Sequence, residues 1–156
     1  MRILVTGVAG FIGAHTAKAL LKRGDEVVGI DNFNPYYDQA LKQARLAEVE
    51  SHPNFEFHAA DLVDKKALTD LYRRIQPDRI IHLAAQPGVR YSLENPQAYI
   101  DANITGFLNI LECARDHGIE HLVYASSSSV YGAHANMPYS VHHLSLIHIS
   151  EPTRPY

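Results

Sequence analysis

The feature that most constrains the fold is a glycine-rich turn between a predicted strand and a predicted helix. Residues 2–6 read Arg-Ile-Leu-Val-Thr, a short apolar and β-branched run typical of a buried parallel strand. Glycines follow at positions 7, 10 and 13, and a predicted helix runs from Phe11 to Arg23 and ends at Gly24. This strand, turn and helix N-terminus predict a pyrophosphate-binding site, because the first N–H groups of a helix attract anions.

The rest of the chain alternates predicted strands with predicted helices. Further strands are predicted at 26–30, 55–59, 79–83 and 122–125, and helices at 39–50, 65–75 and about 97–116. This alternation predicts an α/β fold, a doubly wound parallel sheet of the Rossmann type with strand order 3-2-1-4-5. The fifth strand is expected at an unpaired edge of the sheet, which predicts aggregation. Cys113 is expected as an inert buried thiol on the inward side of the last helix, beside Leu108 and Leu111.

Composition excludes several classes of protein. The chain has 156 residues, of which 46% are hydrophobic and 20% charged, as in a globular domain. The net charge of −3 leaves no basic excess for a nucleic-acid partner. The single cysteine excludes a disulfide within the chain, and the ten histidines lack metal-binding spacing, so no metal is expected. With no signal peptide and no apolar run of about 20 residues, a cytoplasmic protein without a membrane partner is predicted.

Residues at the ends of the predicted strands suit a dinucleotide. Asp31 can accept hydrogen bonds from the adenosine ribose and would repel a 2′-phosphate, which favours NAD over NADP; the alternative is a turn aspartate. Asn32 can assist, and Asp61 and Leu62 can reach the adenine edge unless Asp61 is only a solvated loop acid. The small Ala84 and Ala85 allow close approach of the backbone. The predicted cofactor-binding residues are Gly7, Gly10, Phe11, Ile12, Gly13, Asp31, Asn32, Asp61, Leu62, Ala84 and Ala85.

The spacing Gly-x-x-Gly-x-x-Gly resembles that of the extended short-chain dehydrogenase/reductase family, which includes NAD-dependent epimerases and dehydratases. Further matches follow in order over residues 1 to about 140: Asp61-Leu62, His82-Leu83-Ala84-Ala85-Gln86, Asn103-Ile104-Thr105-Gly106 and Ser126-Ser127-Ser128-Ser129-Val130-Tyr131-Gly132. Within the family, residues 31–38 and 88–92 look like those of UDP-glucuronate 4-epimerases. Related UDP-glucose 4-epimerases and dTDP-glucose dehydratases usually lack one of these two stretches.

The resemblance implies an isomerase of carbohydrate metabolism that acts on a UDP-sugar, with a uronic acid favoured. A hydride passes from C4 of the sugar to NAD, a tyrosine phenolate removes the 4-hydroxyl proton, and the 4-keto sugar rotates before the hydride returns. The resemblance further implies a homodimer formed through helices that include 97–116. It places a catalytic hydrogen bond on Ser127 with Ser128 as the alternative, a cofactor-side role on Asn103, and a substrate carboxylate or phosphate contact on Arg90.

One departure from the family pattern bears on activity. The family's catalytic Tyr-x-x-x-Lys should follow Tyr131 by some twenty residues, and no such motif occurs in the chain. The chain is therefore interpreted as an inactive N-terminal fragment, truncated before the last strands and the C-terminal substrate lobe. The alternatives are a UDP-glucose 4-epimerase or a sugar-nucleotide dehydratase or reductase of the same family, or, in another class, a non-catalytic NAD-binding module.

The domain prediction divides the chain at residue 143. Residues 1–143 are assigned to an incomplete NAD-binding domain. Residues 144–156 fit no element of the pattern and resemble the translation of a transposon-end adapter used to prepare DNA libraries, so they are interpreted as a non-native tail. The alternative is a native strand followed by a tail that contains proline.

Overall fold

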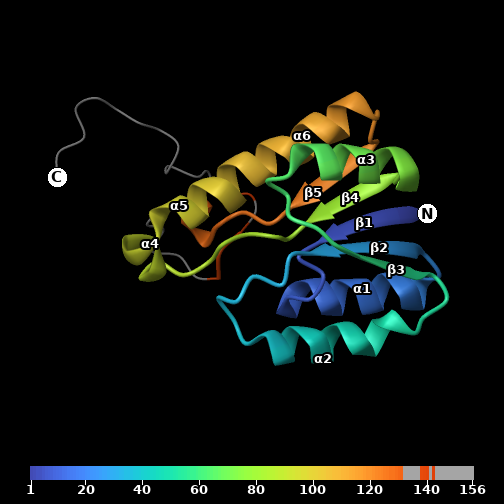
Figure 1. Ribbon diagram of the computed structural model, residues 1–156, viewed down its shortest axis with the longest axis horizontal. Helices are drawn as coiled ribbons and strands as arrows, with labels where there is room; N and C mark the ends of the chain where they lie inside the picture. Colours follow the sequence, from blue (N-terminus) through green and yellow to red (C-terminus); the bar gives the residue numbers. More distant parts are fainter. Residues whose placement is uncertain (132–137, 141, 143–156) are drawn as a thin grey trace. The chain divides into compact units, whose positions relative to one another are not determined.

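A computed structural model describes residues 1–131, 138–140 and 142 (Figure 1). The chain divides into two compact units, residues 1–124 and 125–156. The first unit contains all five predicted strands and the helices that flank them, and the predicted domain boundary at residue 143 stays a prediction. The tail at 144–156 lies outside the described residues.

The first unit is a five-stranded parallel sheet with helices on both faces (Figure 1). The observed strand order, β3-β2-β1-β4-β5, confirms the predicted order, and each strand boundary lies within one residue of its prediction. Helices α1 and α2 cover one face of the sheet, and α3 and α6 cover the other. The strands are β1 (Arg2–Thr6), β2 (Glu26–Asp31), β3 (Phe55–Ala59), β4 (Arg79–His82) and β5 (His121–Tyr124), and these helices are α1 (Phe11–Arg23), α2 (Gln39–Glu50), α3 (Lys65–Ile75) and α6 (Phe107–Asp116).

The long helix predicted near 97–116 is interrupted. It consists of α5 (Pro96–Tyr99), a π-helical segment η1 (Ile100–Gly106) and α6, and the short helix α4 (Tyr91–Glu94) precedes it. Cys113 is buried as predicted, but Leu108 and Leu111 are 53% and 40% exposed, so their expected place beside it is wrong. A π-helical turn is wider than an α-helical turn and changes which residues a following helix turns inward. The buried side of α6 is formed by Asn109, Ile110 and Cys113.

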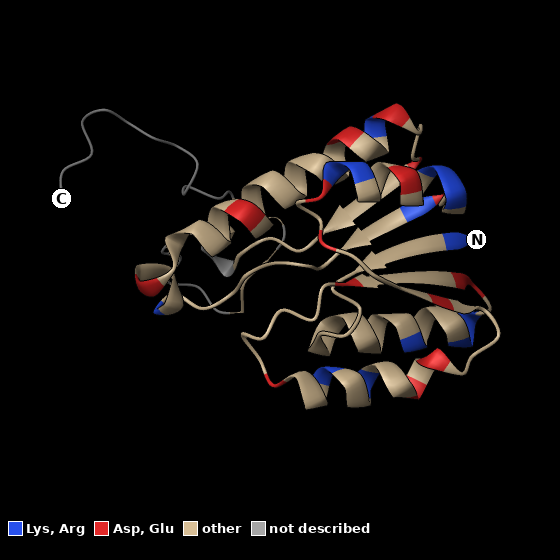
Figure 2. Ribbon diagram, viewed as in Figure 1, with Lys and Arg blue, Asp and Glu red and all other residues tan. Residues whose placement is uncertain are grey.

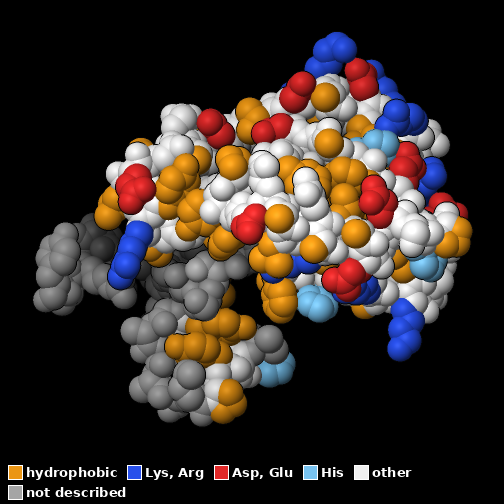
Figure 3. Space-filling view, turned by 60° about the horizontal axis from the view of Figure 1, so that its bottom comes forward, with side chains coloured by type: hydrophobic (Ala, Val, Ile, Leu, Met, Phe, Trp, Pro, Cys, Tyr) orange, Lys and Arg blue, Asp and Glu red, His pale blue; other side chains and the backbone are white. Residues whose placement is uncertain are grey.

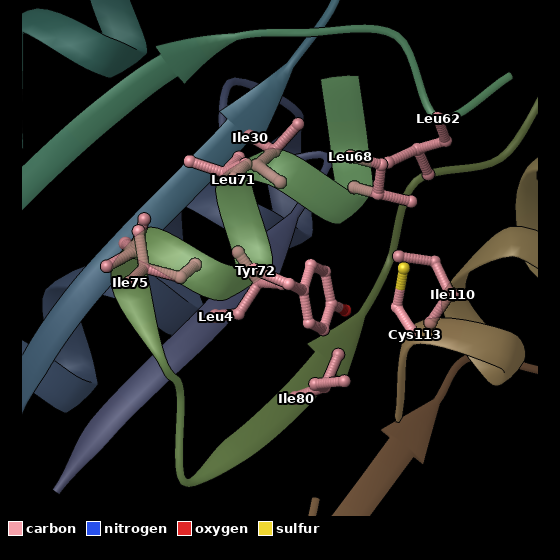
Figure 4. Close-up of a cluster of buried hydrophobic side chains, with 11 residues drawn as sticks. Leu4, Ile30, Leu62, Leu68, Leu71, Tyr72, Ile75, Ile80, Ile110 and Cys113 are labelled. Carbon is pink, nitrogen blue, oxygen red and sulfur yellow. The ribbon is translucent and has the colours of Figure 1, made fainter. Parts of the chain in front are cut away.

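Two hydrophobic clusters hold the helices against the sheet. One lies between the sheet, α3 and α6, where the fully buried Tyr72 ring faces Ile110 and Cys113 (Figure 4). The other joins α1 and α2 to the opposite face of the sheet. The central strand β1 is buried by both clusters, whereas Val123 and Tyr124 of the edge strand β5 are about half exposed, at 48% and 54%. The expected position of the fifth strand at an edge is confirmed.

Charged residues are spread over the molecule. Strands β1 and β4 begin with Arg2 and Arg79, at the end of the sheet opposite to the carboxyl ends of the strands (Figure 2). Acidic and basic side chains are interspersed on the face shown in Figure 3. In the part of the chain that the structure describes, every helix is too short or too polar to cross a membrane.

Candidate functional site

A cavity of about 390 Å³ opens at the carboxyl ends of β1, β2 and β4. These ends are level, because Thr6 pairs with Ile30 on one side and with His82 on the other. The register brings residues from four separate loops together. The cavity is lined by all the predicted cofactor residues that the strand ends indicated: Gly7, Gly10, Phe11, Ile12, Gly13, Asp31, Asn32, Asp61, Leu62, Ala84 and Ala85.

The glycine turn after β1 is held by its own backbone. Gly7 has a φ of +69° and donates its N–H to the Ile30 carbonyl oxygen at 2.8 Å. A Cβ on Gly13 would overlap the Gly7 carbonyl oxygen and would lie 2.8 Å from the Val8 Cα atom. Within the described part of the chain, no side chain caps α1 at Gly10. The first N–H groups of α1 are therefore available to an anionic group in the cavity.

Asp31 is buried and held by three donors. Its Oδ2 accepts the Ala9 N–H at 3.1 Å, and its Oδ1 accepts the Phe33 N–H at 2.9 Å. The Lys42 ammonium of α2 lies 3.2 Å from the same Oδ1. Lys42 also lines the cavity, although the sequence analysis did not single it out. A lysine in a polar helix is normally solvated, and no sequence pattern marks Lys42 as an exception, so only the packing of α2 identifies it.

The loop after β2 is built from successive turns in which a side chain accepts a backbone N–H two residues later. Asp31 accepts from Phe33, Asn32 from Asn34 at 3.0 Å, and Asn34 from Tyr36 at 2.9 Å. The Asn32 amide also donates to Asp61 at 3.0 Å. The loops after β2 and β3 are thereby joined at the cavity wall.

Thr6 and His82 connect the ends of β1 and β4. The Thr6 hydroxyl oxygen accepts the N–H groups of Leu83 and Ala84, both at 3.2 Å, and lies 2.8 Å from His82 Nδ1. Burial lowers the pKa of His82 to about 4, so the imidazole is neutral at pH 7 and its Nδ1 can accept the Thr6 hydroxyl proton. The imidazole also stacks on the Phe107 ring at 5.2 Å. His82 thus connects the end of β4 to the end of β1 and to α6.

Aromatic side chains connect the loop after β2 to the loop after β4. The Tyr36 ring lies 4.8 Å from that of Tyr91, and the Tyr91 ring lies 6.3 Å from that of Tyr99. The Tyr99 hydroxyl donates to the Pro87 carbonyl oxygen at 2.8 Å. Gly88 has a φ of +99°, and a Cβ there would overlap the Tyr36 hydroxyl. The two stretches that look like those of UDP-glucuronate 4-epimerases are therefore in mutual contact.

Asn103 and Arg90 of the first unit are not among the residues that line the cavity. Asn103 accepts the Gln86 N–H at 2.8 Å and donates to the Gln86 carbonyl oxygen at 3.0 Å, so it holds a residue that does line the cavity. Arg90 is exposed at the start of α4. Ser127 and Ser128 belong to the second unit, where the Ser127 carbonyl oxygen accepts the Val130 N–H at 3.0 Å and Ser128 begins a short 3-10 helix. The roles predicted for these residues stay predictions.

No group of three or more His, Cys, Asp and Glu side chains suited to a metal ion occurs among the described residues. The chemistry of the site comes from backbone N–H groups, the Asp31 carboxylate and the Lys42 ammonium. Such a set of groups suits a ligand that combines phosphates with hydroxyl groups, and a dinucleotide is such a ligand.

Comparisons with known proteins agree with this chemistry. The sequence profile of the family described as GDP-mannose 4,6 dehydratase matches residues 4–156. The chain belongs to the GDP-mannose 4,6 dehydratase family. Membership confirms the family-level resemblance that the motifs indicated, and the parallel sheet confirms the predicted fold class.

The chain is also similar to nucleotide-sugar 4-epimerases, both in sequence and in fold. A probable UDP-glucuronate 4-epimerase from Rhizobium meliloti is 50% identical over 140 residues, which make up 90% of this chain and 41% of the relative. A mutant UDP-glucuronic acid 4-epimerase from Bacillus cereus, in complex with UDP-4-deoxy-4-fluoro-glucuronic acid and NAD, is 37% identical with a TM-score of 0.81, and the match covers 93% of this chain and 46% of that one.

The UDP-glucose 4-epimerase of Thermus thermophilus, in complex with NAD, is 34% identical with a TM-score of 0.76 and matches over 93% of this chain and 44% of that one. The chain thus spans less than half the length of each of these three proteins.

Proposed function

We propose that the chain is the NAD-binding part of a nucleotide-sugar 4-epimerase, with UDP-glucuronate as the favoured substrate of the whole protein. The observation that carries the proposal is that one and the same cavity is lined by the glycine turn, Asp31 and the small residues after β4. Membership of a nucleotide-sugar family and relatives named UDP-glucuronate 4-epimerase support it.

The cavity residues fit the parts of NAD. The uncapped N-terminus of α1 suits the pyrophosphate, because its N–H groups and the helix dipole favour negative charge. Asp31, fixed by the Ala9 and Phe33 N–H groups, suits the ribose hydroxyls. Ala84 and Ala85 leave room for the backbone after β4 to lie against the cofactor. When bound, NAD would supply the acceptor for the hydride that leaves C4 of the sugar.

The substrate-side roles rest on the sequence resemblance. Ser127, with Ser128 as the alternative, would donate a hydrogen bond to the sugar 4-oxygen, and Arg90 would contact the carboxylate or a phosphate of the UDP-sugar. The favoured uronic acid is supported by the contact between the loops at 31–38 and 88–92, which ties the two distinguishing stretches together. A homodimer of the whole protein, through helices that include 97–116, is part of the same proposal.

Calorimetric titration of the purified 156-residue chain with NAD tests the cofactor assignment, and an epimerase assay with UDP-glucuronate tests the proposed inactivity. We expect saturable binding of one NAD per chain and no conversion of UDP-glucuronate to its C4 epimer, because the chain has no Tyr-x-x-x-Lys. A folded chain that does not bind NAD would contradict the cofactor assignment and favour a structural remnant. Epimerase activity of the purified chain would contradict the proposed inactivity.

We also propose that residues 144–156 are non-native. The proposal rests on their resemblance to an adapter sequence, and the family match through residue 156 is the observation against it. An independent read of the source DNA across the codons for 140–156 tests it. We expect a frame that continues past His143 into a Tyr-x-x-x-Lys. The same thirteen codons in an independent read would establish the tail as native.

A further inference from the structure

Two loops that start from separate strands meet at the cavity. The loops after β2 and after β4 both extend beyond the carboxyl ends of the strands (Figure 1). Strand β1 lies between β2 and β4 in the sheet, so a contact between these loops spans the end of β1 and the glycine turn that follows it. Residues of all three segments, among them Gly10, Tyr36 and Pro87, line the same cavity. The cavity therefore lies between the glycine turn and the contact of the two loops.

The contact is made by a tyrosine from each loop. The Tyr36 ring lies 4.8 Å from the Tyr91 ring, at an interplanar angle of 39°. A Cβ on Gly88 would overlap the Tyr36 hydroxyl, so this hydroxyl lies directly against the backbone of the loop after β4. The contacts of Tyr36 with Gly88 and Tyr91 are named the tyrosine bridge.

Each loop is anchored separately, and side chains alone form the bridge between them. In the loop after β2, the Tyr36 N–H donates to Asn34 Oδ1 at 2.9 Å. In the loop after β4, the Pro87 carbonyl oxygen accepts the Tyr99 hydroxyl at 2.8 Å. No backbone hydrogen bond joins the two loops within the described part of the chain. The bridge can therefore open by side-chain rotation and small loop movements, which are fast, while both anchors stay in place.

We propose that the tyrosine bridge is a strap that retains NAD in the cavity, and that Tyr91 is a positioning residue that controls the exchange of NAD. The inference rests on the proposed function, which places the pyrophosphate on the glycine turn and the adenosine ribose at Asp31. A dinucleotide bound in this way extends from Asp31 toward Ala84 and passes between the turn and the bridge. The bridge must open before NAD enters or leaves. Tyr91 acts through Tyr36, because Tyr36 lines the cavity and Tyr91 is not among its lining residues.

A strap has a kinetic signature that distinguishes it from a binding contact. The same contact must break for entry and for release, so a strap slows both steps. The dissociation constant, which is the ratio of the two rate constants, stays nearly unchanged. A side chain that touches the bound cofactor instead slows release and leaves the entry rate as it is.

Stopped-flow fluorescence with NADH, the fluorescent reduced form of the cofactor, measures both rates in the 156-residue chain. Mixing with NADH gives the entry rate, and displacement of bound NADH by excess NAD gives the release rate. We expect Tyr91→Ala to raise both rate constants about tenfold and to change the dissociation constant less than about threefold, because the ring that holds Tyr36 is removed. Tyr91→Phe keeps the ring and should retain the rates of the unchanged chain.

Two further variants separate the strap from general effects of substitution. Leu93→Ala truncates a side chain of the same short helix that is 85% exposed, and it should leave both rates unchanged. Tyr36→Phe removes only the hydroxyl that lies against Gly88, and it should raise both rates by a smaller factor of about three. If Tyr91→Ala does not fold, as judged by thermal unfolding, Tyr36→Phe carries the test.

Each outcome has a distinct meaning. Unchanged rates in a folded Tyr91→Ala variant would overturn the strap while the proposed function stands. A change in only one of the two rates would likewise overturn it, and so would a Tyr91→Phe variant that exchanges NADH as fast as Tyr91→Ala. An unchanged chain that binds neither NADH nor NAD would overturn the proposed function, and the strap with it.

Discussion

The turn after β1 and the loop after β4 face the same cavity, but they are built in different ways. The turn is held by backbone atoms, with the Gly7 N–H on the Ile30 carbonyl oxygen and Gly13 packed against the Gly7 backbone. The loop at 83–95 is held by side chains. Asn103 accepts a hydrogen bond from the Gln86 N–H, Tyr99 donates one to the Pro87 carbonyl oxygen, and the rings of Tyr36 and Tyr91 are in contact. A backbone contact tolerates no added atom, whereas the end of a side chain can move aside. Substitutions in the two regions should therefore differ in cost.

Gly13→Ala should have the largest effect. Its Cβ would overlap the Gly7 carbonyl oxygen and approach Val8 Cα, and neither backbone atom can move without disturbing β1. We expect a loss of about 3 kcal/mol or more in the free energy of unfolding, and a melting temperature lower by about 10 °C. Urea and thermal unfolding followed by circular dichroism measure both quantities.

Gly10→Ala is the matched control in the same turn. Its Cβ would meet only the Gly7 carbonyl oxygen, at 3.0 Å, and its φ of −73° suits alanine. We expect a loss of about 1 kcal/mol or less. Equal losses for the two variants would contradict the view that overlap with the backbone, rather than the loss of a glycine, determines the cost.

The hydrogen bond that joins the two regions should make stability depend on pH. The pKa of His82 is about 4 in the folded state and about 6.5 in the unfolded chain, so below about pH 6.5 the unfolded state binds a proton that the folded state does not. The contribution of His82 to the free energy of unfolding is therefore fully present above pH 6.5, and it falls as the pH decreases toward 4. Between about pH 7.5 and 5 the loss should approach about 2 kcal/mol, measured from urea unfolding.

His82→Gln is the variant that isolates this contribution. The variant should be less stable than the unchanged chain at about pH 7.5, because it lacks the imidazole that contacts Thr6 and Phe107. Glutamine does not titrate, so the further loss of stability on acidification should be smaller. The other histidines and the carboxylates are common to both proteins, and their effects cancel in the comparison. Parallel pH dependences for the two proteins would show that His82 does not supply the pH response.

The same contrast explains how much of the molecule the sequence predicts. The alternation of strands and helices is predictable because the spacing of apolar residues along the chain specifies each element locally. The glycine turn is predictable because it requires glycines at a fixed spacing. The π-helical turn before α6 was missed, and with it the exposure of Leu108 and Leu111. The Lys42–Asp31 pair and the Tyr36–Tyr91 contact depend on how separate loops and helices pack, which no local pattern encodes.

Gly88→Ala should cost less than Gly13→Ala, although Gly88 has the less favourable backbone. Its φ of +99° costs an alanine about 1 kcal/mol, and its Cβ would overlap the Tyr36 hydroxyl, which lies at the end of a side chain. Gly24→Ala supplies the strain alone, because Gly24 has a φ of +91° and nothing within 4 Å of its Cβ position. The additional loss in Gly88→Ala over Gly24→Ala then measures the contact with Tyr36.

Tyr36→Phe removes the overlapping hydroxyl and should recover part of that additional loss in the double variant. Urea unfolding of the two single variants and the double variant completes the cycle. If Gly88→Ala and Tyr36→Phe are strictly additive, the loop after β4 does not depend on the tyrosine contact.

Tyr99→Phe should have the smallest effect. It removes the hydroxyl that donates to the Pro87 carbonyl oxygen at 2.8 Å but keeps the ring that lies 6.3 Å from Tyr91. A single hydrogen bond near the surface contributes about 0.5 to 1 kcal/mol, since water replaces the lost donor. Tyr37→Phe, at a residue that is 53% exposed, is the matched control and should leave stability unchanged. A loss for Tyr99→Phe as large as that for Gly13→Ala would mean that the loop after β4 is as intolerant of change as the glycine turn, and the distinction between the two regions would fail.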